Sequence, residues 1–206
     1  MCSLPRKRKK RESLAFSIVK RHIQPHTQVV DMVFPMIKDT QALGGSWADN
    51  KKKILEFLQE GKKVVFITLG DPMLYSTYIY VFKLLQDLGH QVVNIPGIPA
   101  FCAITSHTGF PIAEWTDVVA IVPATAAPDK IEKVLDICDA AVLMKVYKNS
   151  SQIIGMLQEK GFAANAVLAS DVGTEREMIV RNISEAKDQP CSYLSTIVAR
   201  RAAQNR

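Results

Sequence analysis

A Gly-Asp-Pro turn at residues 70–72 gives the clearest chemical signal in the sequence, because it follows the apolar run 63–69 and precedes a helical pattern that reaches Leu88. In open α/β sheets, ligands bind outside the carboxyl ends of the strands. Gly70 lets a ligand approach the backbone closely. Asp71 can cap the helix, or it can accept hydrogen bonds from an amine or a ribose hydroxyl. A plain turn with an Asp cap explains the same residues, because short motifs often match by chance.

A second turn, at residues 96–101, has the same placement, because it follows the apolar run 91–95 and opens a helix. Two such turns at strand ends could line one crevice. The alternative is an ordinary connection between a strand and a helix, in which Pro and Gly supply the turn geometry. The sequence contains neither a G-x-G-x-x-G segment nor a Walker segment, so it gives no support for a phosphate cradle.

Cysteine and histidine patterns predict no metal site. No C-x-x-C pair occurs among the four cysteines, Cys2, Cys102, Cys138 and Cys191. His22 and His26 have a helical spacing, but Pro25 between them would break the helix that aligns them, so we interpret them as a solvated helix end. A chain of this length can fold without disulfides, and the scattered cysteines indicate a reducing, cytoplasmic location.

The composition is that of a globular chain with one basic segment. Of the 206 residues, 48% are hydrophobic and 22% are charged, which excludes a largely disordered protein. No run approaches the roughly 18 consecutive apolar residues of a membrane span. Of the 26 cationic residues, six are consecutive at Arg6–Arg11, which leaves 20 against 20 acidic residues and accounts for the net charge of +6. We interpret this segment as a solvated arm, and we expect neither a nucleic-acid partner nor a membrane.

Hydrophobic patterns predict alternating strands and helices, which indicates an α/β fold with mainly parallel pairing. In the first half, we expect helices from Ser13, at 46–60, from the first turn to Leu88 and at 99–107, and strands at 29–34, 63–69 and 91–95. In the second half, we expect helices at 128–137 and 150–160, and strands at 117–122, 140–146, 165–170, 178–181 and 193–200. The continuous apolar run 63–69 is typical of a strand buried on both faces.

The pattern is interrupted near residues 109–115 by Gly109, Pro111 and a polar stretch. We therefore predict two α/β domains, residues 1–112 and residues 113–206. The late run of strands without long helices predicts a mixed sheet in the second domain.

Three segments taken together, 65–77, 96–101 and 142–148, resemble the tetrapyrrole methylases. Residues 11–15 and 193–196 also resemble the early helix and the last strand of that family. The resemblance runs from about residue 5 to about residue 201, and the order of the motifs makes it specific. Within the family, it is strongest to the enzymes that methylate carbon 20 of precorrin-2, or of its cobalt form, in cobalamin biosynthesis.

The resemblance implies a homodimer of chains with two α/β domains and a ligand crevice between them, which holds S-adenosyl-L-methionine. The amino-acid and ribose side of this cosubstrate would contact residues 69–71, and Leu74 would pack on it. The facing wall would be formed by residues 99–101. The adenine would be covered by residues 144–146 and 172–174 of the second domain. The implied cofactor-binding residues are Leu69, Gly70, Asp71, Leu74, Pro99, Ala100, Phe101, Met144, Lys145, Val146, Gly173 and Thr174. For residues 142–146, an ordinary core strand is the alternative.

The chain departs from the family at its beginning. The family opens with an apolar strand that runs into a Gly-Pro-Gly-Asp loop and a helix, whereas Met1 is followed by the basic arm. We therefore expect a first-domain sheet that lacks its opening strand and leaves apolar side chains uncovered.

The implied reaction transfers a methyl group from a sulfonium to a bridging carbon of a reduced, anionic tetrapyrrole. The electron-rich pyrrole system supplies the nucleophile, so no Ser, Cys or His nucleophile is needed, and positioning provides most of the catalysis. No catalytic residue is assigned, because a packing or capping role explains Tyr75 and Asp71 at least as well as that of a base. Arg11, Lys20 and Lys145 are candidate partners for the substrate carboxylates.

Two other interpretations stay open. A relative within the same superfamily would methylate another acceptor, such as a different corrin carbon or a modified histidine on a protein. Alternatively, the chain is a non-catalytic homologue, or its basic arm binds nucleic acid. Phosphate contacts by six cations would make affinity fall steeply with salt, and the arm contains no aromatic residue for stacking on bases.

Overall fold

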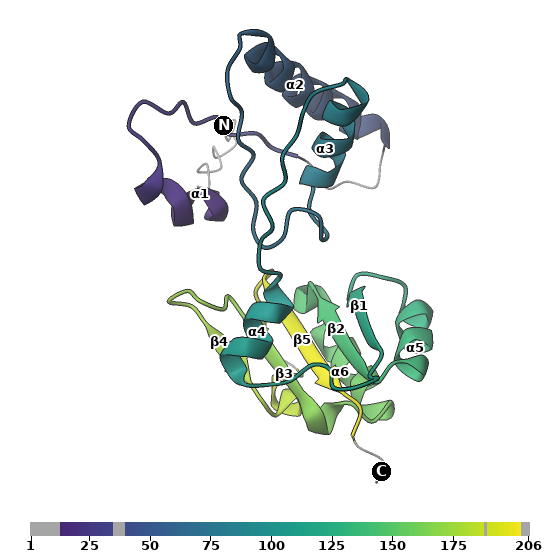
Figure 1. The fold of residues 1–206 in the computed structure, drawn as a ribbon. Coiled ribbons are helices and arrows are strands. Elements are labelled where there is room, and N and C mark those ends of the chain that lie inside the picture. The colour runs from purple at the N-terminus through teal and green to yellow at the C-terminus, as the bar shows by residue number, and fades with distance from the viewer. Residues whose placement is uncertain (1–12, 35–39, 188, 203–206) are drawn as a thin grey trace, which may run out of the picture. The chain divides into compact units, whose positions relative to one another are not determined.

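The computed structural model describes residues 13–34, 40–187 and 189–202, and it divides the chain into two compact units, Met1–Gly97 and Ile98–Arg206 (Figure 1). The division lies earlier in the chain than the predicted boundary between residues 112 and 113. The reason is packing, because Ile104 and Phe110 lie in one hydrophobic cluster with residues of the second unit's sheet.

The second unit is built on a five-stranded mixed sheet with the order β1-β2-β5-β3-β4. Its strands are β1 (Val119–Pro123), β2 (Ala140–Met144), β3 (Ala166–Ser170), β4 (Met178–Val180) and β5 (Ser195–Arg200). β1 and β2 are parallel, whereas β5 is antiparallel to both of its neighbours and β4 is antiparallel to β3. This confirms the predicted mixed sheet and its five strands, with shifted ends. The expected mainly parallel pairing is wrong, because three of the four strand pairs in this sheet are antiparallel.

Helices cover both faces of this sheet (Figure 1). The helices are α4 (Ala100–Thr108), α5 (Pro128–Ile137) and α6 (Ser150–Glu159), with the short 3-10 helices η2 (Val146–Lys148), η3 (Ala163–Asn165) and η4 (Ile183–Ala186). Because successive side chains of a strand point to opposite faces, Ile197 of β5 joins the core under α5 and α6, while Val198 joins the core under α4. Apolar burial on both faces stabilises this unit.

The regular secondary structure in the described part of the first unit is helical, and extended segments connect its helices. It contains α1 (Leu14–Val19), the 3-10 helix η1 (Lys20–His22), α2 (Thr40–Gln59) and α3 (Tyr78–Asp87). As predicted, α1 begins after Ser13, whose hydroxyl accepts a hydrogen bond from the Phe16 N–H at 3.4 Å. Aromatic contacts connect its segments, because the Phe66 ring centre lies 5.6 Å from that of Phe34 and 5.4 Å from that of Tyr78. Within the described ranges, no helix is both long and apolar enough to cross a lipid bilayer.

The strands predicted at residues 29–34, 63–69 and 91–95 are wrong, because the described residues of the first unit form no β-ladder. An apolar run shows that a segment suits a sheet, but a strand also needs a neighbour whose N–H and C=O groups match its own. The expected burial on both faces is wrong too, since Val65 is 82% exposed and Val93 is 77% exposed. This unit therefore carries uncovered apolar side chains on extended segments.

The difference in pairing predicts a difference in amide hydrogen exchange. Amides of β2, β3 and β5 are hydrogen-bonded within a buried sheet, so we expect them to exchange only through large openings of the second unit. Amides of residues 63–69 and 91–95 should exchange faster by on the order of a thousandfold or more, because their opening free energies are small. Mass-spectrometric exchange on the full chain measures both sets at once. Equal protection of both would contradict the unpaired state of the first-unit segments.

Candidate functional site

In the first unit, the carboxylate of Asp71 joins the two turns that the sequence singled out. Its Oδ1 accepts a hydrogen bond from the Met73 N–H at 2.8 Å, and its Oδ2 accepts one from the Gly97 N–H at 3.1 Å. The expected helix cap is absent, because α3 begins only at Tyr78. Asp71 therefore fixes the relative position of residues 70–73 and 97 rather than opening a helix.

The two turns also approach each other through their backbones. Gly70 has φ 67°, in the left-handed region that favours glycine. A Cβ added to Gly97 would collide with the carbonyl oxygen of Gly70. Glycine at position 97 is therefore required by a close backbone contact inside the first unit, independently of any ligand.

Polar contacts extend from these turns to the start of α3. The Ser76 hydroxyl accepts a hydrogen bond from the Tyr78 N–H at 3.2 Å and lies 3.1 Å from the Thr68 hydroxyl oxygen. The Tyr78 hydroxyl donates to the side-chain oxygen of Asn94. Burial raises the pKa of Tyr78. Sequence reasoning missed the pair of Tyr78 and Asn94, because neither residue belongs to a turn motif.

In the second unit, β5 brings two predicted segments to one edge of the sheet. Met144, the last residue of β2, pairs with Thr196, and Ser170, the last residue of β3, pairs with Ser195. The segments after these strand ends, 144–146 and 171–174, therefore leave the sheet at the same edge. The structure thus groups the second-unit residues that were predicted separately from two strands.

The backbone is strained just beyond both strand ends. Lys145 has φ 62° and Asp171 has φ 49°, values that non-glycine residues rarely adopt, and Gly173 has φ 80°. Such strain persists only where the surrounding structure fixes it, and it is common at ligand sites. Val146, in contrast, has no exposed surface and lies in the hydrophobic core. The alternative of an ordinary core segment therefore holds for the Val146 side chain.

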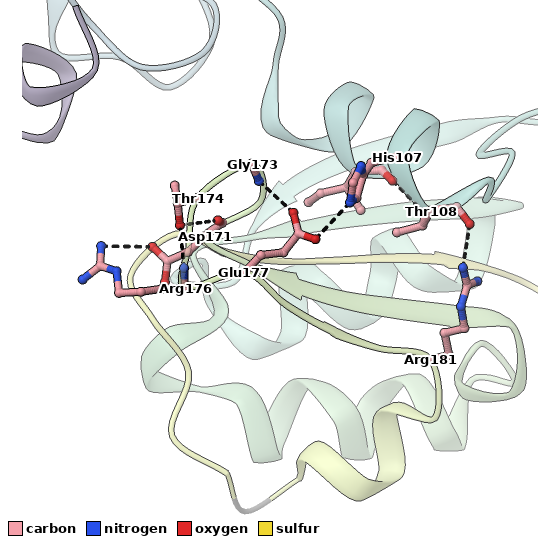
Figure 2. A network of polar contacts seen from close by, with 9 residues as sticks. His107, Thr108, Asp171, Gly173, Thr174, Arg176, Glu177 and Arg181 are labelled. Atoms are coloured by element: carbon pink, nitrogen blue, oxygen red, sulfur yellow. Dashed lines mark hydrogen bonds and ion pairs between the residues drawn. The ribbon is translucent and has the colours of Figure 1, made fainter.

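The turn after β3 is held by a residue that the sequence analysis did not name (Figure 2). Glu177 accepts a hydrogen bond from the Gly173 N–H at 2.8 Å, and its other oxygen lies 2.9 Å from Nε2 of His107 on α4. The Gly173 N–H, and then His107, lower the pKa of Glu177, so its carboxylate stays charged at neutral pH. His107 and Glu177 are far apart in sequence, so local patterns could not pair them.

The remaining predicted residues lie at the start of α4. Pro99 immediately precedes this helix, and Ala100 is its first residue. Ala100 is exposed, whereas Phe101 packs beside the cluster of Ile104 and Phe110. The predicted site residues thus form two sets, Leu69 to Leu74 in the first unit and the others in the second.

One sequence profile of a known family covers most of this chain. It is that of the Tetrapyrrole (Corrin/Porphyrin) Methylases, and it matches residues 7–187. The chain belongs to this family. The resemblance drawn from the order of the motifs is thereby confirmed, and a mixed α/β fold is what the structure of this methylase shows.

Individual relatives support the same assignment. The methylase is 34% identical to a cobalt-precorrin-2 C(20)-methyltransferase of Salmonella typhimurium, over 94% of this chain and 82% of that protein. It is 28% identical to a probable cobalt-precorrin-2 C(20)-methyltransferase of Methanocaldococcus jannaschii, over 96% of this chain and 83% of that protein. Among solved structures, the uroporphyrin-III C-methyltransferase of Thermus thermophilus in complex with S-adenosylhomocysteine has a similar fold, with a TM-score of 0.57, 18% identity and coverage of 73% and 72% of the two chains.

Two of the three candidate cations of the methylase lie within the described residues. Lys20 is an exposed residue of η1, and Lys145 is a half-buried residue at the strained end of β2. Arg11 and the rest of the basic arm lie outside the described residues.

The close contact of the two turns yields a prediction for Gly97→Ala. Because the new Cβ meets the Gly70 carbonyl, we expect the first unit to lose about 1–3 kcal/mol of stability, as overpacked sites do. Gly155→Ala is the matched control, since a Cβ at that position on α6 meets no atom within 4 Å and alanine favours a helix by about 0.5–1 kcal/mol.

Urea denaturation measures the stability of the two variants, and hydrogen exchange measured in each unit shows which unit has lost stability. The Gly97 amide should also exchange faster in an Asp71→Asn variant, because an amide side chain has only one oxygen acceptor. A stable Gly97→Ala variant with an unchanged Asp71 contact would contradict the close approach.

Proposed function

We propose that this methylase transfers a methyl group from S-adenosyl-L-methionine to carbon 20 of precorrin-2, or of its cobalt form, in cobalamin biosynthesis. The observation that carries the proposal is the 34% identity to the Salmonella typhimurium cobalt-precorrin-2 C(20)-methyltransferase, which extends over 94% of this chain and 82% of that protein. A partial match to one shared domain would not have this coverage of both chains.

The residues of the chain fit S-adenosyl-L-methionine, which supplies an electrophilic methyl group on its sulfonium. In the first unit, Gly70 has a φ of 67° and no side chain, so a ligand can approach the backbone closely there, and we assign Leu69, Gly70, Asp71 and Leu74 to the amino-acid and ribose side. In the second unit, a Cβ on Gly173 would meet nothing within 4 Å, so the turn has open space beside it. We assign the cofactor-binding residues of this unit as Pro99, Ala100, Phe101, Met144, Lys145, the Val146 backbone, Gly173 and Thr174.

The chemistry requires orientation more than a reactive side chain. Carbon 20 of the macrocycle forms a new bond to the methyl carbon while the bond between methyl and sulfur breaks, and a proton then leaves the methylated position. Holding donor and acceptor in line is worth several orders of magnitude in rate. Both oxygens of Asp71 already accept backbone hydrogen bonds, so we assign Asp71 a structural role rather than that of the base.

The substrate is a polycarboxylate, so cations favour its binding. We assign this role to Lys145, which lies at the same sheet edge as the turn after β3, with Lys20 and Arg11 as further candidates. A cytoplasmic homodimer completes the proposal. It is supported by the family resemblance, by the scattered cysteines, and by the exposed apolar side chains of the first unit, since large uncovered apolar surface is typical of interaction sites.

A methylation assay tests the reaction. Purified protein is incubated with S-adenosyl-L-methionine and either precorrin-2 or its cobalt form, and the product is analysed by mass spectrometry and by NMR with a carbon-13 methyl donor. We expect one added methyl group on carbon 20. Methylation of another corrin carbon, or none with either form, would contradict the proposed function.

Cofactor binding is tested by Gly70→Val with Gly89→Val as its control. Both glycines have a positive φ, 67° and 76°, so both variants carry the same kind of backbone strain, of about 1–2 kcal/mol. Only Gly70 lies in the proposed site. In calorimetric titrations we expect Gly70→Val to abolish binding of S-adenosyl-L-methionine and Gly89→Val to retain it. Loss in both variants would point to strain alone, and retention in both would remove Gly70 from the site.

A further inference from the structure

One carboxylate ties the turn after β3 to helix α4 (Figure 2). The two oxygens of Glu177 have different partners: Oε2 accepts from the Gly173 N–H at 2.8 Å, and Oε1 lies 2.9 Å from Nε2 of His107. Glu177 is an exposed residue with 27% of its side chain accessible, and His107 is about half exposed. The geometry therefore makes Glu177 a bridge between a loop and the last turn of a helix.

The other contacts of this turn are internal or local. The Asp171 carbonyl accepts hydrogen bonds from the Thr174 N–H at 3.1 Å and from the Thr174 hydroxyl at 2.8 Å. The Arg176 guanidinium lies 3.8 Å from the Asp171 carboxylate and is largely exposed. None of these contacts involves the N–H of Gly173, and glycine has the greatest conformational freedom of any residue. The hydrogen bond from Thr174 to Asp171 closes the turn around Gly173, which has a φ of 80°, and the bond that the Gly173 N–H donates to Glu177 is the contact that fixes this turn to the rest of the unit.

The bridge ends on the helix that opens the second unit. His107 lies in the last turn of α4, which begins at Ala100. A second contact reinforces this junction, because the Arg181 guanidinium donates to the Thr108 carbonyl at 2.7 Å. Two segments that we assigned to the cofactor, the start of α4 and the turn at Gly173, thus belong to elements joined by Glu177.

We propose that Glu177, anchored by His107, is a positioning residue for S-adenosyl-L-methionine, which holds the Asp171–Thr174 turn in its binding conformation. This inference rests on the proposed function, because it takes the turn as part of the cofactor site. Glu177 does not touch the reacting atoms. Its removal leaves the turn to be ordered at the moment of binding, which weakens affinity but leaves the methyl transfer step itself unchanged.

The test compares three variants of the protein. Glu177→Ala removes the acceptor of Gly173. Glu177→Gln keeps an oxygen acceptor for the Gly173 N–H and an amide that can donate to a neutral His107. Glu175→Ala is the matched control, since Glu175 is an exposed acidic residue of the same loop and makes no hydrogen bond or ion pair with other described residues. Each variant is measured for the KM of S-adenosyl-L-methionine, for kcat, and for exchange of the Gly173 amide.

For Glu177→Ala we expect a rise of roughly tenfold in the KM of S-adenosyl-L-methionine and a similar acceleration of Gly173 exchange, the effect of losing one charge-assisted hydrogen bond. We expect kcat, and the KM of the tetrapyrrole, to stay within about threefold, and Glu177→Gln and Glu175→Ala to stay close to the wild type. A merely structural defect would lower stability without this split between KM and kcat.

Two results would overturn the inference. The first is an unchanged KM of S-adenosyl-L-methionine in Glu177→Ala despite faster exchange at Gly173. The second is a KM in Glu177→Gln as high as that in Glu177→Ala, which would rule out the hydrogen bond from Gly173 as the cause. A wild-type protein that binds no S-adenosyl-L-methionine contradicts the proposed function as a whole. In that case unchanged Gly173 exchange in Glu177→Ala would overturn the positioning role as well.

Discussion

The second unit depends on the pairing of β5 with β2 on one side and with β3 on the other. The last strand of the chain thereby lies in the centre of the sheet, and Ser195 to Ala199 are fully or almost fully buried. A buried strand must have its N–H and C=O groups paired, so β5 requires two neighbours in register. Because β5 is antiparallel to both, the carboxyl ends of β2 and β3 meet at its beginning. One pairing constraint thus builds the core and brings together the turns proposed to bind the cofactor.

At this edge of the sheet, beyond the carboxyl ends of β2 and β3, the backbone is strained, and the packing of the second unit holds it in that conformation. Two non-glycine residues there, Lys145 and Asp171, have positive φ values, and Gly173 adopts a positive φ without strain. The residues next to them are tightly packed, since Val146, which follows Lys145, is buried, and the hydroxyls of Ser170 and Ser195 are in hydrogen-bond contact. Strained turns on a rigid base can present backbone groups in one fixed arrangement, as binding of a small polar molecule requires. In the first unit, Asp71 serves the same purpose differently, because it ties two turns that no sheet supports.

Sequence patterns predicted the second unit much better than the first, and pairing explains why. The strands at 140–146 and 165–170 are apolar, and the structure confirms them because β5 pairs with both. The run 63–69 is as apolar, yet it has no ladder partner among the described residues. Periodicity reports which side chains suit a sheet, whereas a partner strand depends on the rest of the chain. For the same reason the bridge from His107 through Glu177 to Gly173 was missed, because its residues come from two distant segments and from no motif.

The reaction itself explains why single residues were weak guides to this methylase. A sulfonium already activates the methyl group, and the macrocycle supplies the carbon nucleophile, so the chain is not required to provide a triad, a metal or a phosphate loop. What remains is to hold two molecules in line, a task for backbone groups, glycines and apolar walls. Those features occur in ordinary connections between strands and helices too, and each turn taken alone was open to that explanation. Only the order of several such turns along the chain distinguishes the family. That order depends on the whole fold, whereas a single turn depends only on local geometry.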